Sequence, residues 1–183
     1  MQNPLTGQSI RFITTSQDSA GRVLEMESSF SHAGPEPPAH FHPAQEEHFL
    51  VLEGELQVRL QGRLLRLRPG QRLRVAPGQV HSMWNAGEAR TTVRWTVLPA
   101  LRTEEFLENV FGLAQDGQVN AQGKPGLLPA AVLAGEYAPE FRLARPPRWV
   151  QRLVFGLLRP LARAIGLPAL VLRYAESRHP QAA

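Results

Sequence analysis

Residues 9–98 are divided into short segments of strand length, and this division constrains the fold more than any other feature of the chain. Each segment is bounded by Gly, Pro, Asn or Asp, and several alternate apolar with polar residues, as strands with one buried face do. Many short strands at close spacing favour an antiparallel sandwich or barrel over a parallel sheet. The expected strands are residues 9–16, 22–30, 47–52, 55–60, 63–67, 71–76, 81–85 and 91–98.

The sequence pattern becomes helical after residue 100. A Gly- and Pro-rich connection separates a first amphipathic segment from a helical tail, so we expect a β domain over residues 1–100 and a helical extension over residues 101–183. Thr103 is the expected N-cap of the first helix. The expected helices are residues 103–117, a short helix at 127–137, and two or three short helices within 147–178, with Pro147, Pro160 and Pro168 each at a first helical position.

Composition and charge exclude several classes of function. The chain of 183 residues has no cysteine, which rules out disulfides, thiolate metal sites and cysteine nucleophiles. Residues 1–140 hold 12 basic and 15 acidic side chains, whereas residues 141–183 hold eight arginines against Glu176 alone. Because the positive charge is confined to the tail, we do not expect a nucleic-acid partner. Residues 1–20 lack the basic start and apolar centre of a signal peptide, so we expect a cytoplasmic protein.

The tail is a basic amphipathic stretch that allows three interpretations. Arg148, Arg152, Arg159 and Arg163 fall on one side of a helical wheel, and Val150, Val154, Leu157, Leu161 and Ile165 lie roughly opposite. The favoured interpretation is that the apolar side packs on the barrel or on a second subunit. Contact of residues 147–178 with an anionic membrane surface is the main alternative, and contact with another partner or an acidic ligand is the third. A membrane-spanning helix is not expected, because Arg and Pro interrupt the apolar run.

Two histidines and a carboxylate at metal-ligand spacing stand out in the segment 39–56. His40 and His42 are separated by one residue, so in a strand their side chains point to the same face. Glu47 follows five residues later, and His81 follows a Pro-Gly turn further along the chain. Three imidazoles and one carboxylate suit a divalent transition metal, whether Mn, Fe, Co, Ni, Cu or Zn. The other histidines, His32, His48 and His179, have no such neighbours.

These segments resemble the two sequence motifs of the cupin superfamily. GPEPPAHFHPAQEEHFLVLEG, residues 34–54, is similar to the first motif, in which a glycine, His-x-His, a glutamate and a second glycine follow at set intervals. Counting back from Gly54 selects Glu47, not Glu46, as the ligand. GQRLRVAPGQVHSMWN, residues 70–85, resembles the second motif, with Ala76 where the family usually has proline.

The resemblance covers about residues 7–100 and is closest to small single-domain bacterial cupins of the quercetin dioxygenase-like, type 2 group. It implies a mainly β fold, a double-stranded β-helix or jelly-roll barrel with C-terminal α-helices. It implies that His40, His42, Glu47 and His81 hold one divalent metal ion inside the barrel. It also implies a homodimer as the default assembly.

The strand pattern predicts a largely apolar pocket around this site. Phe49, Val51, Met83 and Trp95 are the expected lining residues, although plain core packing is the alternative for each of them. One hypothesis is a dioxygenase-type oxidoreductase, in which a small oxygen-chelating substrate binds the metal and Glu47 takes a proton. The other is a non-catalytic module that binds or senses a small molecule through the metal. The sequence does not distinguish between them.

Overall fold

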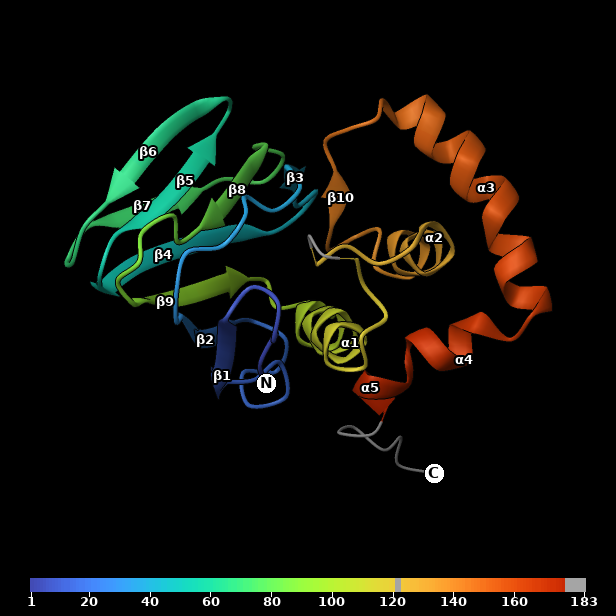
Figure 1. Cartoon of the computed structure of the whole chain (residues 1–183), viewed down its shortest axis with the longest axis horizontal. Helices are drawn as coiled ribbons and strands as arrows, with labels where there is room; N and C mark the ends of the chain where they lie inside the picture. The colour runs from blue at the N-terminus through green and yellow to red at the C-terminus, as the bar shows by residue number, and fades with distance from the viewer. Residues whose placement is uncertain (121–122, 177–183) are drawn as a thin grey trace.

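The computed structural model describes residues 1–120 and 123–176, and shows two five-stranded antiparallel sheets followed by helices (Figure 1). The first sheet has the order β1-β2-β9-β4-β7, and the second has the order β10-β3-β8-β5-β6. The strands are β1 (Gln8–Thr14), β2 (Leu24–Phe30), β3 (His40–Phe41), β4 (Glu46–Glu53), β5 (Leu56–Leu60), β6 (Arg63–Leu67), β7 (Arg72–Val75), β8 (His81–Trp84), β9 (Thr91–Leu98) and β10 (Arg142–Leu143).

All eight strands expected from the alternation are present, two of them with the predicted bounds, and the jelly-roll class of fold is confirmed. The structure adds two strands of two residues each. β3 carries His40, and β10 comes from the helical extension and pairs with β3 antiparallel. The extension therefore supplies the edge strand of the second sheet.

The main core lies between the inner faces of the two sheets. Its fully buried side chains come from alternate positions, as Val93 and Val97 of β9 and Leu24 of β2 show. This is the face that the alternation predicts, because successive side chains of a strand point to opposite sides of a sheet. Between β5 and β6, Gln61 and Gly62 both have positive φ angles, which matches the twist of a tight two-residue hairpin.

The helices are α1 (Thr103–Gln115), α2 (Leu127–Glu136), α3 (Arg148–Ala164), α4 (Leu167–Val171) and α5 (Arg173–Glu176). In α1 the prediction of Thr103 as the cap is wrong: Arg102 occupies the cap position, and Thr103 is the first helical residue. The hydroxyl of Thr103 instead lies 2.7 Å from the side-chain nitrogen of Gln45. Leu107 and Phe111 of α1 join the core between the sheets, so this helix packs on the barrel.

The prediction of a helix break at Pro160 is also wrong. Pro160 lies inside α3, which runs through it for 17 residues. Proline removes one backbone hydrogen bond and crowds the carbonyl four residues earlier, here that of the exposed Gly156. A single missing bond leaves the turns on either side intact. Pro147 directly precedes α3, and Pro168 lies in the first turn of α4.

Helix α3 forms the outer arch of the molecule and turns an apolar stripe towards solvent (Figure 1). The stripe has one large apolar residue at every fourth position, each at least half exposed: Trp149, Leu153, Leu157, Leu161 and Ile165. Within one chain the barrel does not cover this stripe, so its packing on a second subunit or a membrane surface stays a prediction. Among the described residues, none of the helices combines the length and apolarity needed to cross a bilayer.

Candidate metal centre

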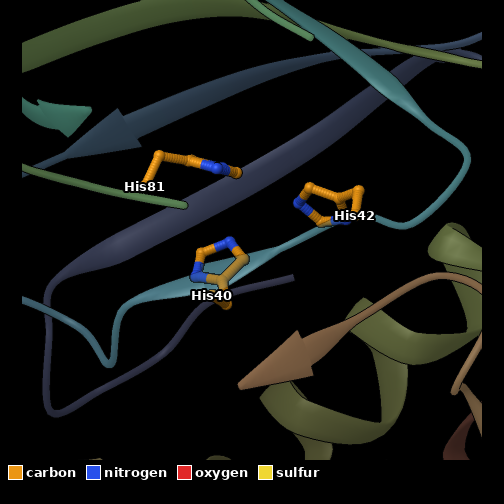
Figure 2. Close-up of side chains that lie close together, drawn as sticks. All are labelled: His40, His42 and His81. Atoms are coloured by element: carbon orange, nitrogen blue, oxygen red, sulfur yellow. The ribbon is translucent and has the colours of Figure 1, made fainter. Parts of the chain in front are cut away.

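Three histidine side chains, from β3, the loop after it and β8, meet near one another (Figure 2). His40 of β3 and His81 of β8 are directly paired across the sheet, and their ring centroids are 4.5 Å apart. His42 follows β3, and its ring lies 5.2 Å from that of His40 and 5.3 Å from that of His81. One ring nitrogen of each residue lies within 4.8 Å of the others, a spacing that could hold a metal ion.

A backbone carbonyl faces the Nδ1 atom of each histidine. The distances are 3.0 Å from His40 to the oxygen of Pro38, 2.5 Å from His42 to that of Glu140, and 3.1 Å from His81 to that of Gln79. A carbonyl oxygen can only accept, so each Nδ1 must carry the hydrogen and donate it. In the neutral imidazole this leaves the lone pair on Nε2. The three carbonyls therefore fix the tautomer that presents Nε2 to a metal.

Glu47 is fully buried beside these rings. Its Oε1 lies 3.2 Å from Nε2 of His42, and its Oε2 lies 2.7 Å from Nε2 of His81. The indole N–H of Trp95 donates to Oε1 at 3.1 Å, which holds the carboxylate in place. Burial alone would raise the pKa of Glu47, but His42 and His81 more than offset it and keep the pKa well below its usual range. The carboxylate is therefore an anion, the form that a cation binds.

The pKa values of His40 and His42 are shifted in opposite directions. Burial, together with the neighbouring His81 and His42, lowers the pKa of His40 to about 3, so that His40 is neutral at pH 7. Burial also acts to lower the pKa of His42, but the charge of Glu47 outweighs it and the pKa is raised. His42 and Glu47 thus form a buried pair that shares a proton readily, and an incoming cation would displace that proton.

Two buried atoms of this group support a metal. Nε2 of His42 lies near Oε1 of Glu47, and Oε2 of Glu47 lies near Nε2 of His81. Even so, neither Nε2 of His42 nor Oε2 of Glu47 has a well-directed hydrogen bond within the described part of the chain. Buried polar atoms without such a bond are costly unless another group satisfies them. Both atoms belong to the predicted ligand set, and a cation among them would accept a lone pair from each. The residues present therefore fit a metal with histidine and carboxylate ligands.

The loop that connects His42 to Glu47 is held by Gln45. The side-chain nitrogen of this buried residue lies 2.8 Å from the carbonyl oxygen of Pro99 and 3.0 Å from that of Ala100. These contacts join the loop to the end of β9 and the start of α1. The position of Glu47 relative to His42 therefore depends on contacts with the region where the barrel meets the extension.

The extension also covers the histidines. The ring of Phe141 stacks on that of His40 with centroids 4.7 Å apart, and the carbonyl of Glu140 accepts the hydrogen bond from His42. Phe141 in turn stacks on Phe106 of α1. Phe141 and Glu140 were not predicted as site residues, since they lie in a Gly- and Pro-rich connection with no periodic pattern. No local signal in that segment indicates a contact with residues about a hundred positions earlier.

The predicted lining residues lie in the core next to the site. Phe49, Val51, Met83 and Trp95 are all buried members of the cluster between the sheets. The Phe49 ring lies 6.4 Å from that of His81 and 5.8 Å from that of Trp95. Of these four, Trp95 contacts the candidate metal ligands through its hydrogen bond to Glu47.

The remaining histidines lie away from the cluster where the structure describes them. His48 is exposed on the opposite face of β4 from Glu47, as the alternation predicts, and contacts the neighbouring Glu46. His32 is exposed as well. His179 lies outside the described residues.

Comparison with known proteins identifies the class of this fold. Residues 29–98 match the family model of the cupin domain. This stretch includes the three histidines and Glu47, so the matched region contains the whole candidate site. The chain has the mainly β jelly-roll fold of cupins with C-terminal helices, and its histidine triad could bind a metal. No curated protein matches the chain.

Several solved structures are similar to about half of the chain. KdgF from Halomonas sp. shares 18% identity, with a TM-score of 0.44, over 51% of this chain and 79% of its own. A protein with a double-stranded β-helix domain from Klebsiella pneumoniae shares 22% identity, with a TM-score of 0.45, over 51% and 74%. A predicted oxalate decarboxylase from Thermotoga maritima shares 16% identity, with a TM-score of 0.47, over 50% and 80%.

Proposed function

We propose that this protein binds one divalent transition metal through His40, His42, His81 and Glu47, and that it is a dioxygenase-type oxidoreductase acting on a small oxygen-chelating substrate. The observation that carries the proposal is the uniform tautomer of the three histidines. Each Nδ1 is engaged by a backbone carbonyl, so each Nε2 is available as a ligand.

The donor set leaves room for substrate chemistry. Four protein ligands on an ion that prefers six would leave two positions for oxygen atoms. When bound, the ion would supply Lewis-acid polarisation and a template for a chelating substrate. The buried apolar side chains of Phe49 and Met83 nearby would exclude water from that region. A substrate with two adjacent oxygens on an apolar or aromatic frame suits such surroundings.

Glu47 has two roles in this proposal. While His42 and His81 contact it, its lowered pKa makes it a ligand and a weak base. If the carboxylate were released from both the ion and these histidines as substrate binds, its burial would favour the protonated form and allow it to take a proton from the substrate. The Trp95 N–H would keep the carboxylate oriented during that change.

A non-catalytic binding or sensing module is the second candidate, and the covered site favours it. Phe141 and the Glu140 carbonyl contact two of the three histidines from outside the barrel. A ligand that reached the metal by displacing this segment would change the position of β10. A change in the position of β10 would then signal that the ligand is bound, without any turnover.

The first experiment is elemental analysis of protein purified without added metal, with His81→Ala compared with the exposed control His48→Ala. We expect about one metal ion per wild-type chain and per control chain, and little in His81→Ala. Equal metal in all three proteins would overturn the proposed site. Oxygen consumption with a panel of flavonols and β-diketones then tests the activity. Thermal stabilisation by a compound without oxygen uptake would favour the binding module.

A further inference from the structure

A second site is suggested by a cavity outside the barrel, between α2, β10 and α3. Its volume is about 350 Å³. Four arginines line it, namely Arg142, Arg148, Arg152 and Arg159, while its lining includes no aspartate or glutamate. The remaining wall is formed mainly by small or aromatic residues, among them Gly135, Gly156 and Phe155. The cavity is thus strongly positive and has flat apolar surfaces.

The four guanidinium groups are not neutralised within the described part of the chain. None of them forms an ion pair with a carboxylate there, whereas Arg59, Arg74, Arg94 and Arg102 elsewhere all do. Arg142 donates to the carbonyl of Ala138, which fixes its side chain at the cavity wall. Four like charges around one space repel each other, and the structure describes no protein anion that offsets this repulsion.

The backbone of α2 makes room for one of these arginines. A Cβ atom on Gly135 would lie 2.4 Å from Cζ of Arg159, so any other residue at this position would displace the guanidinium. Arg159 is partly buried between α2 and α3. Because no described carboxylate forms an ion pair with it, its charge is available to a ligand that supplies the opposite charge.

We propose that this cavity binds a phosphate group of a small molecule or a lipid headgroup. Guanidinium groups match phosphate oxygens through paired N–H donors. A phosphate carries up to two negative charges and three terminal oxygens, and so suits a cavity lined by four arginines better than a single carboxylate does. Phe155 and Phe141 provide surfaces for an apolar or aromatic part of the ligand.

The cavity is distinct from the metal site but touches its cover. Phe141 lines the cavity and also stacks on His40. A ligand in the cavity would therefore contact the ring that lies over the histidines. Binding of a phosphate by these arginines does not depend on whether the histidines bind metal.

Titration calorimetry of the full chain with inorganic phosphate and pyrophosphate tests the proposal. We compare Arg159→Gln with the control Arg66→Gln. Arg66 is exposed on β6, so its replacement removes the same charge far from the cavity. Wild type and Arg66→Gln should bind alike, and Arg159→Gln should bind about tenfold more weakly or worse. Circular dichroism checks that both variants are folded. Equal weakening in both variants would show a general charge effect and overturn the site.

Vesicles distinguish the two sources of phosphate. Sedimentation with vesicles of phosphatidylcholine alone is compared with vesicles that also contain phosphatidic acid. Binding to the acidic vesicles that Arg159→Gln weakens, in the absence of binding to free phosphate or pyrophosphate, assigns the cavity to a lipid headgroup. Binding to the free anions assigns it to a soluble phosphate compound. If wild type binds neither the anions nor the acidic vesicles, the proposal is wrong.

Discussion

The ring of Phe141 lies against the imidazole of His40, with an angle of 28° between their planes. One residue belongs to the extension and the other to the barrel, so the candidate metal centre is built by both parts of the chain. The same segment supplies β10, which pairs with β3. The extension is therefore a structural component of the site.

Replacement of Phe141 by alanine should open the site. The variant removes the ring that covers His40, and we expect roughly tenfold faster loss of bound metal to a chelator, since changes to groups that support ligands have effects of this size. Phe155→Ala is the matched control, because this ring also lines the outer cavity but belongs to α3. Equal rates for the two variants would contradict a covering role of Phe141.

Trp95→Phe should weaken metal binding while the core remains packed. The change keeps an aromatic ring but removes the N–H that donates to Glu47. We expect about a tenfold to hundredfold loss of metal affinity and a decrease of about 1–2 kcal/mol in the free energy of unfolding. Competition with a chromophoric chelator measures the affinity. Trp84→Phe, on β8 beside Arg59, is the control and should leave the affinity unchanged.

Tyr137 should titrate at unusually high pH. Burial raises the pKa of its hydroxyl to about 12, although the nearby Arg102 acts to lower it. Because the folded pKa lies above that of an unfolded tyrosine, near 10, this residue contributes stability below pH 10 that is lost as the pH rises through 12. Absorbance at the phenolate band should show a transition near pH 12 that is missing in Tyr137→Phe. If the transition that Tyr137→Phe removes lies instead at the ordinary tyrosine pKa, the buried position of Tyr137 is wrong.

Two glycines in helices should respond to alanine in opposite directions. At Gly112 of α1 a Cβ would lie 2.2–2.7 Å from ring atoms of Tyr174, so Gly112→Ala should lower the free energy of unfolding by about 1–3 kcal/mol. At Gly156 of α3 a Cβ meets nothing within 4 Å, so Gly156→Ala should raise it by about 0.5–1 kcal/mol. Denaturant unfolding measures both. Stabilisation by Gly112→Ala would show that Tyr174 does not pack there.

The strands of the barrel and the meeting of its three histidines could be predicted because their signals are local. Alternation along β9 places Val93, Trp95 and Val97 on one face whatever lies opposite. The motif around His40 and His42 is likewise contained in a few residues. By contrast, β3 and β10 are two residues long, and their pairing depends on residues about a hundred positions apart. Such short strands have no period to detect.

The orientation of helix α3 is a second feature that the sequence pattern does not predict. Its amphipathic character is visible in the sequence, but periodicity does not say which side meets the rest of the protein. In the structure the contact with α2 uses the side that carries Arg159, and Leu157 on the apolar side is 71% exposed. Only the packing of α2 against α3 decides this orientation.

The hydrogen bond between His42 and the carbonyl of Glu140 also bears on synthesis of the chain. The two residues are 98 positions apart, and strands β1 to β9 all precede Glu140. On the ribosome, every barrel strand from β1 to β9 emerges before the carbonyl that fixes the His42 tautomer. A barrel that folds at that stage has its histidines uncovered, so a metal ion could reach them before residues 140 and 141 lie over them.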